Sequence, residues 1–141
     1  MLHLRIVIAA LFAISILSGC GKKITFLQSS VVPAAIGSVK VKKDHNENYA
    51  INLSVRNLIE PKRLQPPKKN YTVWLETEDN RGENIGRIQS SKGLFSKTLK
   101  GKLQTVTSFK PVRFFITAED HDNPQHPGPL VVLNTKIFKI R

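Results

Sequence analysis

The sequence predicts an all-β domain, an antiparallel β-sandwich or a small barrel, that follows an N-terminal export segment. Three observations predict this fold class. From residue 34 onward, short stretches alternate between apolar and polar residues and are rich in β-branched and aromatic side chains. Turn-forming residues separate these stretches roughly every ten residues. No window carries a long apolar stripe at helical spacing, so we expect about eight short strands in a sandwich or a small barrel.

Length and composition set the first limits. The 141 residues fall within the range of about 100 to 200 residues expected for one domain. With 40% hydrophobic and 23% charged residues, the composition is typical of a globular protein rather than a disordered one. The single cysteine excludes an intramolecular disulfide, a CxxC redox pair and a multi-cysteine zinc site.

Residues 1–19 have the pattern of a secretory signal peptide. Arg5 provides the positive flank, residues 6–17 form the apolar stretch, and small residues follow. This stretch is shorter than the approximately 20 apolar residues that a membrane-spanning helix needs. The residues that end the segment resemble, without a mismatch, the lipobox of bacterial lipoproteins: Leu17, Ser18, Gly19 and Cys20.

The lipobox resemblance implies cleavage between Gly19 and Cys20 and a diacylglycerol thioether on the Cys20 thiol. Several acyl chains would anchor the protein far more firmly than one. In Gram-negative lipoproteins, an Asp after the lipidated cysteine is the usual signal for retention in the inner membrane, and this chain has Gly21 there. The resemblance therefore implies an outer-membrane lipid anchor with the domain facing the periplasm.

The chain after the signal peptide is expected to have two parts. Residues 20–33 show no sustained period, which favours a lipidated cysteine followed by a tether. The β-sandwich domain is expected over residues 34–141. Its first strand should cover residues 34–43, with Val39 and Val41 facing inward.

Alternation and turn residues define the next three strands. Residues 48–58 alternate throughout, and their apolar face consists of Tyr49, Ile51, Leu53 and Val55. After a proline-containing break, residues 71–78 alternate again. The turn at residues 79–82 leads into a short strand over residues 84–90. We expect these last two strands to form a hairpin.

Four further strands complete the expected set, over residues 95–99, 103–109, 112–119 and 130–140, the last broken near Asn134. Within 112–119, Phe114 and Ile116 point to one face, while Phe115 and Thr117 point to the other. This arrangement puts the Phe115 ring on a face expected to be wet, unless a loop covers it.

Two further resemblances concern the fold. They rest on residues 71–77, 84–87, 114–119 and 128–133, which include the Tyr-x-x-Trp strand and its following hairpin. These stretches resemble the extracytoplasmic β-sandwich domain of anti-sigma-factor-type proteins and a group of small bacterial lipoproteins with an immunoglobulin-like sandwich. The chain departs from the anti-sigma pattern because it lacks a cytoplasmic sigma-binding segment and a spanning helix. A sigma-sequestering role is therefore not expected.

Charge carries the functional signal. Twenty-two Lys plus Arg against ten Asp plus Glu give a net charge of +12, which favours anionic partners. The basic residues cluster, and the candidate anionic-ligand patch consists of Lys62, Arg63, Lys68, Lys69, Lys97, Lys100 and Lys102. Lysines in strands also prevent sheet edges from pairing with other chains, so a role in solubility stays open. Export makes nucleic acid an unexpected partner.

The sequence therefore predicts a membrane-anchored, non-catalytic interaction module without a cofactor, whose partner is an envelope protein or an anionic lipid or glycan. A first alternative is an accessory subunit of an envelope assembly that pairs through a strand edge. A second alternative, from a different class, is a metal-binding protein or hydrolase using His121 and His126, with Asp120 or Asp122 as a further ligand. No GxSxG elbow or phosphate-binding glycine loop is present.

Overall fold

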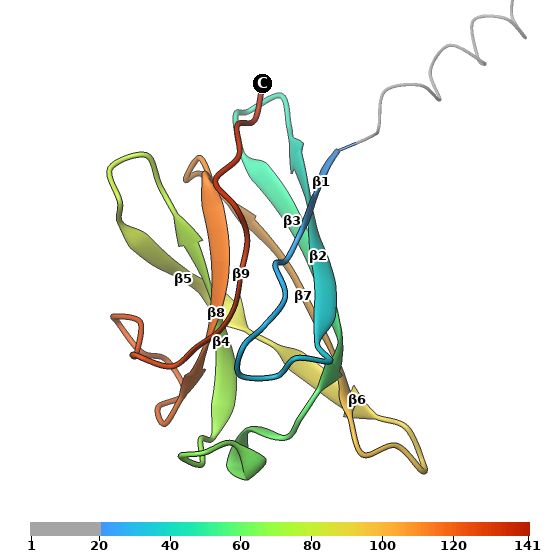
Figure 1. The fold of residues 1–141 in the computed structure, drawn as a ribbon. Helices are drawn as coiled ribbons and strands as arrows, with labels where there is room; N and C mark the ends of the chain where they lie inside the picture. The colour runs from blue at the N-terminus through green and yellow to red at the C-terminus, as the bar shows by residue number, and fades with distance from the viewer. Residues whose placement is uncertain (1–20) are drawn as a thin grey trace, which may run out of the picture.

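The computed structural model describes residues 21–141, which form two antiparallel sheets packed face to face (Figure 1). The five-stranded sheet has the order β1 (Lys22–Thr25), β2 (Ile36–Lys43), β3 (Tyr49–Leu58), β7 (Leu99–Thr107) and β6 (Gln89–Lys92). The four-stranded sheet has the order β5 (Gly82–Arg87), β4 (Asn70–Glu76), β8 (Arg113–Glu119) and β9 (Val131–Asn134). A 3-10 turn, η1 (Pro61–Arg63), lies between β3 and β4. The predicted all-β class is confirmed.

The strand order is that of an immunoglobulin-like sandwich. Strands β2, β3, β7 and β6 occupy the places of strands A, B, E and D, and β4, β8 and β9 those of C, F and G. Strand β5 adds to the free side of β4, and β1 adds to the free side of β2. Between β5 and β6 the chain crosses from one sheet to the other at the buried Ile88.

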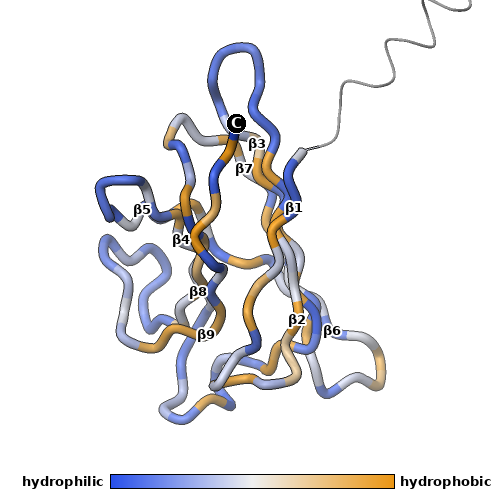
Figure 2. Tube along the Cα trace, turned by 45° about the horizontal axis from the view of Figure 1, so that its top comes forward, coloured by the Kyte–Doolittle hydropathy of each residue, from blue (hydrophilic) through white to orange (hydrophobic). Residues whose placement is uncertain are grey.

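The core lies between the two sheets and follows the alternation seen in the sequence. Val39 pairs with Leu53, and Leu53 pairs with Leu103, so one apolar row crosses β2, β3 and β7. Val39 and Leu53 are both fully buried, as predicted. Each such side chain contributes about 1.5–3 kcal/mol relative to exposure. Figure 2 shows the hydrophobic stretches along the strands and hydrophilic residues in the turns.

The outer face of the four-stranded sheet is also covered. Trp74 and Phe115 on this face are buried, although the alternation would place them in water. The segment 120–130 folds back over them: Asn70 Nδ2 donates to the His121 carbonyl at 3.0 Å, and Asn84 Nδ2 donates to the Pro124 carbonyl at 3.0 Å. The covering loop that Phe115 requires is therefore present.

Three strand predictions differ from the structure. The strand predicted over residues 84–90 is divided between β5 and β6, which belong to different sheets. Residues 95–99 do not form a strand of their own, because residues 93–98 make the tip of the β6–β7 hairpin. The turn is closed by the Ser96 amide, which donates to the Gly93 carbonyl at 3.1 Å. The strand predicted over 130–140 ends at Asn134, beyond which Phe138 N–H donates to the Val112 carbonyl at 2.9 Å.

The predicted tether is the main correction to the domain boundaries. Residues 22–25 form β1 in the five-stranded sheet, with Ile24 paired to Val39. Beyond β1, Phe26 and Val32 are buried in the core. The side chain of Ser29 donates to the Val132 carbonyl at 2.5 Å, which fixes this segment to β9. Alternation of apolar and polar residues does not stand out in this part of the sequence because β1 is only four residues long.

No helix within residues 21–141 has the length and apolarity to cross a membrane.

Candidate functional site

The proposed lipidation motif, Leu17, Ser18, Gly19 and Cys20, lies outside the described residues. The described chain begins at Gly21, directly before Lys22, which pairs with Val41 of β2. The polypeptide therefore enters the fold at one end of the five-stranded sheet.

The outward face of the five-stranded sheet is strongly basic. Its exposed basic residues, which we call the basic outer face, are Lys23 of β1, Lys40 and Lys42 of β2, Arg56 of β3, and Lys100 and Lys102 of β7. The five strands of the sheet contain no Asp or Glu at all. Within residues 21–141, none of these six basic side chains forms an ion pair.

The register places like charges side by side. Lys23 on β1 is directly opposite Lys40 on β2, and both side chains face outward. Directly opposed residues in neighbouring strands lie about 5 Å apart at Cβ, so like charges there are destabilising. The remaining outward positions of the same strands are mostly neutral polar groups: Thr25, Ser38, Asn52, Ser54 and Gln104. Repulsion on this face is therefore relieved by water and counterions rather than by the protein.

The positions of these cations also bear on the solubility hypothesis. Lysines that prevent sheet-edge pairing belong on edge strands. Strands β2, β3 and β7 are internal to the sheet, so Lys40, Arg56 and Lys102 have no edge to protect. Edge protection thus accounts for Lys23 on β1 alone.

A shallow hollow of about 540 Å³ lies on this face, where β2 and β7 begin and β3 ends. Charged groups border it on both sides, with Lys23 on one strand and Arg56, Lys100 and Lys102 on two others. Hydroxyl groups of Thr25, Ser38 and Ser54 lie between them. The hollow can therefore accept negative charge and hydrogen-bonding groups together.

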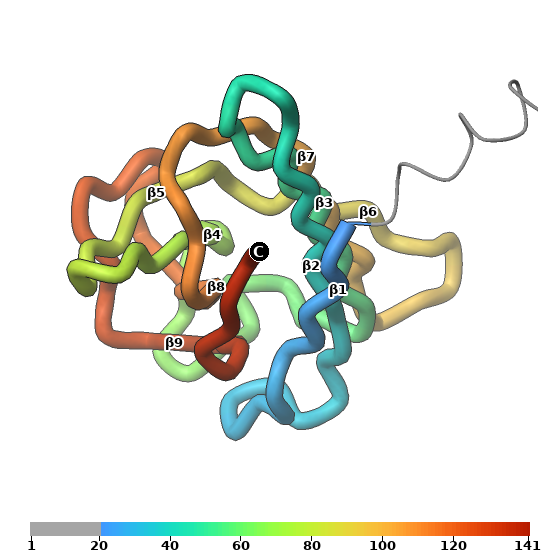
Figure 3. The backbone as a smooth tube through the Cα atoms, turned by 90° about the horizontal axis from the view of Figure 1, so that it is seen from above, coloured from blue at the N-terminus to red at the C-terminus, as the bar shows by residue number. Residues whose placement is uncertain are grey.

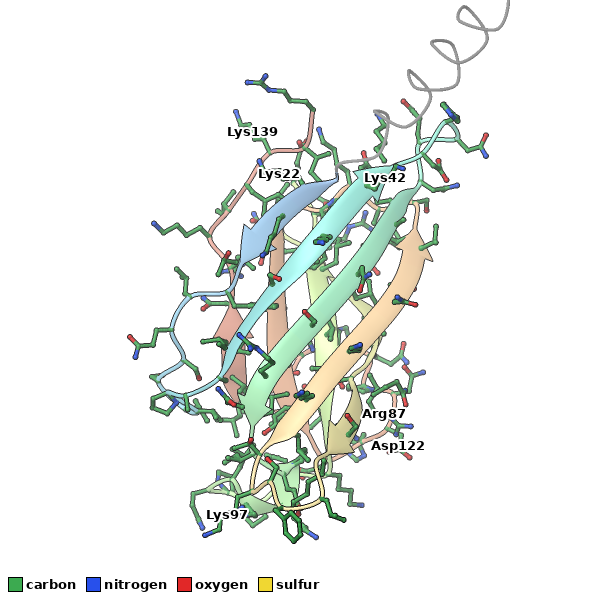
Figure 4. The ribbon with its side chains drawn as sticks, turned by 90° about the vertical axis from the view of Figure 1, so that its right-hand side faces the viewer. Lys22, Lys42, Arg87, Lys97, Asp122 and Lys139 are labelled. Carbon is green, nitrogen blue, oxygen red and sulfur yellow. The ribbon has the colours of Figure 1, made fainter. Side chains whose placement is uncertain are left out.

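The structure divides the predicted patch in two. Lys100 and Lys102 belong to the basic outer face. The other members lie at the end of the sandwich far from Gly21, where Figure 4 labels Lys97. There, Lys62 Nζ lies 3.1 Å from a Glu60 carboxylate oxygen, and Lys68 Nζ lies 2.9 Å from an Asp120 carboxylate oxygen. The seven residues therefore do not form a single continuous surface.

Hydrogen bonds at this opposite end hold two carboxylates in the charged form. Hydrogen bonds from Lys92 and Lys62 lower the pKa of Glu60, and a hydrogen bond from Lys68 lowers the pKa of Asp120. Arg63 donates to the Lys97 carbonyl at 3.4 Å, while Lys69 uses its backbone N–H to bond the Glu119 carbonyl at 2.9 Å. Part of the positive charge at this end is therefore neutralised internally.

Four members of the basic outer face are absent from the predicted patch: Lys23, Lys40, Lys42 and Arg56. Lys23 was missed because residues 20–33 were expected to form a tether. The alternation in β3 indicates that Arg56 points away from the core. Its neighbours on β7, however, lie more than 40 residues further along the chain. Strand pairing, which the sequence does not show directly, brings them together.

The histidine loop does not assemble a metal site. No group of three or more His, Cys, Asp or Glu that could hold a metal occurs in residues 21–141. The Asp122 carboxylate lies 3.1 Å from Arg87 Nη1 (Figure 4), and Asp120 pairs with Lys68. Both acids that could join His121 and His126 are therefore engaged by cations.

Comparison with known proteins returned no matching family model, curated protein or solved structure.

Proposed function

We propose that this protein is a membrane-anchored envelope lipoprotein whose basic outer face binds an anionic partner without catalysis. One observation carries the proposal: six exposed basic side chains share one face of a sheet whose strands contain no Asp or Glu. The anchor follows from the lipobox resemblance at Cys20, and the location is the periplasmic side of the outer membrane. Non-catalytic binding is favoured because the face offers cations and hydroxyl groups but neither a nucleophile held by a base nor paired acids.

An extended acidic glycan fits the face best. Repulsion between Lys23 and Lys40 destabilises the unbound protein, so an anion placed over this pair relieves an existing cost. The internal strands fix the spacing of the backbone positions from which these cations project. Asn52 and Gln104 are directly paired at the centre of the sheet and can hydrogen-bond sugar hydroxyls.

The binding proposal is tested with heparin as a soluble anionic glycan. The variant Lys40→Gln/Lys100→Gln/Lys102→Gln removes three charges from the basic outer face. Its matched control, Lys62→Gln/Lys69→Gln/Lys97→Gln, removes three charges from the opposite end. We expect the first variant to elute from immobilised heparin at markedly lower salt than the control. Fewer cations on the binding face then attract the heparin, so less salt is needed to screen that attraction. Equal elution of the two variants would show that only total charge matters.

The lipid anchor is tested separately. We expect Cys20→Ala to leave an unprocessed chain that takes up no radiolabelled palmitate, while the parent protein is labelled. Incorporation of label by the variant would contradict the anchor without affecting the heparin result.

A second candidate function, an accessory subunit of an envelope assembly, is favoured by the β6–β7 hairpin. Strand β6 lies at the sheet edge, and the hairpin tip exposes Leu94 and Phe95, at 91% and 95% of their full surface. Exposed apolar side chains of this size at a projecting tip are typical of protein contacts. A photo-cross-linker at Phe95 that captures one recurrent envelope protein would support this candidate, and Phe95→Ser should then abolish the complex.

A further inference from the structure

The end of the sandwich at which the described chain begins has a distinct composition. This anchor end comprises Gly21 and the start of β1, the β2–β3 and β4–β5 turns, the β7–β8 connection and the C-terminal segment. Figure 3 looks down on it and shows the C-terminal segment between the two sheets. Figure 4 places Lys22, Lys42 and Lys139 here together. Because β1 starts at Lys22, only Gly21 separates Cys20 from the first strand.

The acids of the anchor end are largely used within the protein. Their ion pairs are Lys43–Glu47, Arg81–Asp79, Lys110–Glu78 and Arg113–Glu76. The Asp44 carboxylate accepts the Asn46 and Asn48 amides at 2.8 and 2.9 Å and so closes the β2–β3 turn. Among residues 21–141, Lys22, Lys42 and Lys139 have no carboxylate partner. The charge left over at this end is positive.

Apolar side chains are exposed among these lysines. Ile137 is 73% exposed, Val106 is 64% exposed and Phe109 is 39% exposed. A hollow of about 710 Å³ opens here between the two sheets, with Val112, Ile137, Phe138 and Ile140 among its apolar lining and Lys22, Lys110, Lys139 and Arg141 among its cationic lining. Lys22 Nζ lies 5.9 Å from the centre of the Phe138 ring and donates to the Lys139 carbonyl at 2.6 Å.

We propose that the anchor end is a membrane-contact surface that rests on anionic phospholipid headgroups of the bilayer holding Cys20. The inference rests on the proposed lipid anchor, which leaves a single residue between the bilayer attachment and β1. Exposed apolar residues flanked by lysines are the composition that binds an anionic bilayer interface. The domain is thus held by two contacts, the acyl chains and its own surface.

This contact fixes the orientation of the domain. The strands of the five-stranded sheet run between the anchor end and the opposite end, which carries the β6–β7 tip (Figure 1). With the anchor end on the bilayer, the sheets stand upright, and the basic outer face is turned sideways toward the periplasm. Its hollow stays accessible to a glycan instead of lying against lipid.

The test uses the lipidated protein reconstituted in vesicles containing phosphatidylglycerol, with bromine-labelled acyl chains as a fluorescence quencher. A tryptophan is introduced by Ile137→Trp at the anchor end or by Phe95→Trp at the opposite end. The native Trp74 is fully buried and gives a constant background. We expect loss of fluorescence for Ile137→Trp and none for the Phe95→Trp control.

Charge dependence completes the test. Adding Lys42→Gln/Lys139→Gln to Ile137→Trp should lower the ratio of membrane-contacting to free orientations about fivefold per lysine. Replacing phosphatidylglycerol with uncharged phosphatidylcholine in the vesicles should likewise reduce quenching of the tryptophan at position 137. Equal quenching at positions 137 and 95, or no quenching at 137, would overturn the proposed contact. A failure of lipidation can be told apart from a failure of the membrane contact. An unlipidated protein would lack the palmitate label and would have no acyl anchor to carry it down with the vesicles.

Discussion

The rings of Trp74 and Phe115 stack on the outer face of the four-stranded sheet, with centroids 6.2 Å apart and planes 11° from parallel. The two residues are directly opposite each other in the β4–β8 pairing. The Trp74 indole N–H donates to Thr117 Oγ1 at 2.7 Å, and the buried Glu119 carboxylate accepts the Thr117 hydroxyl and the Gly128 amide. This cluster forms a second, smaller core beneath the segment 120–130.

Removing the Phe115 ring should destabilise the protein substantially. We expect Phe115→Ala to lower the free energy of unfolding by about 3 kcal/mol, because the change leaves a cavity beside Trp74. Urea unfolding followed by Trp74 fluorescence measures this loss. The control is Phe95→Ala, at a ring that is 95% exposed, which should leave the unfolding midpoint unchanged. Equal effects of the two substitutions would mean that the covered face is not a packed core.

The hydroxyl of Thr117 links the indole to the buried carboxylate. Thr117→Val keeps the shape of the side chain but leaves the Trp74 N–H without its acceptor and Glu119 without one donor. We expect a loss of about 1–3 kcal/mol in unfolding free energy and a changed near-ultraviolet circular dichroism of Trp74. The exposed Thr25→Val serves as control. An unaltered Trp74 spectrum in Thr117→Val would contradict the linked arrangement.

The segment preceding residue 34 should be required for stability. A chain beginning at Ala34 lacks the buried side chains of Ile24, Phe26 and Val32 and the edge strand β1. Each apolar side chain contributes about 1.5–3 kcal/mol, against a typical total stability of about 5–15 kcal/mol. We therefore expect a chain from Gly21 to unfold cooperatively in thermal circular dichroism and a chain from Ala34 to be largely unfolded. Similar melting curves would restore the tether hypothesis.

The Tyr71 hydroxyl should lose its proton only at unusually high pH. Burial raises the pKa of Tyr71 from 10.0 to about 12, and its hydroxyl donates to the Ile59 carbonyl at 2.8 Å. The neutral phenol is favoured in the folded state, so its contribution to stability is complete below pH 10 and is lost as pH rises through about 12. In Tyr49→Phe, where Tyr71 is the remaining tyrosine, phenolate absorbance should appear near pH 12. A midpoint near pH 10 while the protein stays folded would contradict the buried placement.

Local alternation made most of the sandwich predictable. In β3, Tyr49, Ile51, Leu53 and Val55 alternate with polar residues, and all four are buried. The sequence signal failed where burial comes from both sides or from a short segment. Trp74 and Phe115 are covered by a loop with no period of its own, and β1 has too few residues for alternation to stand out.

The candidate site was only partly predictable for a different reason. Lys100 and Lys102 were identified from their clustering along the chain, as were Lys62 and Lys68. The structure separates these pairs, because Lys62 and Lys68 face Glu60 and Asp120, whereas Lys102 lies on the same sheet face as Arg56 and Lys23. Charge that is contiguous in space depends on strand order, and strand order depends on long-range pairing that local patterns do not encode.

The most direct test of the account is site-specific photo-cross-linking in living cells from two exposed positions on opposite sheets. Asn52 lies at the centre of the basic outer face, and Val131 lies on β9 of the other sheet and is 43% exposed. With the cross-linker at position 52, we expect capture of an anionic envelope glycan that high salt prevents, and no such product from position 131. Capture from position 131 with none from position 52 would contradict the assignment of the binding face.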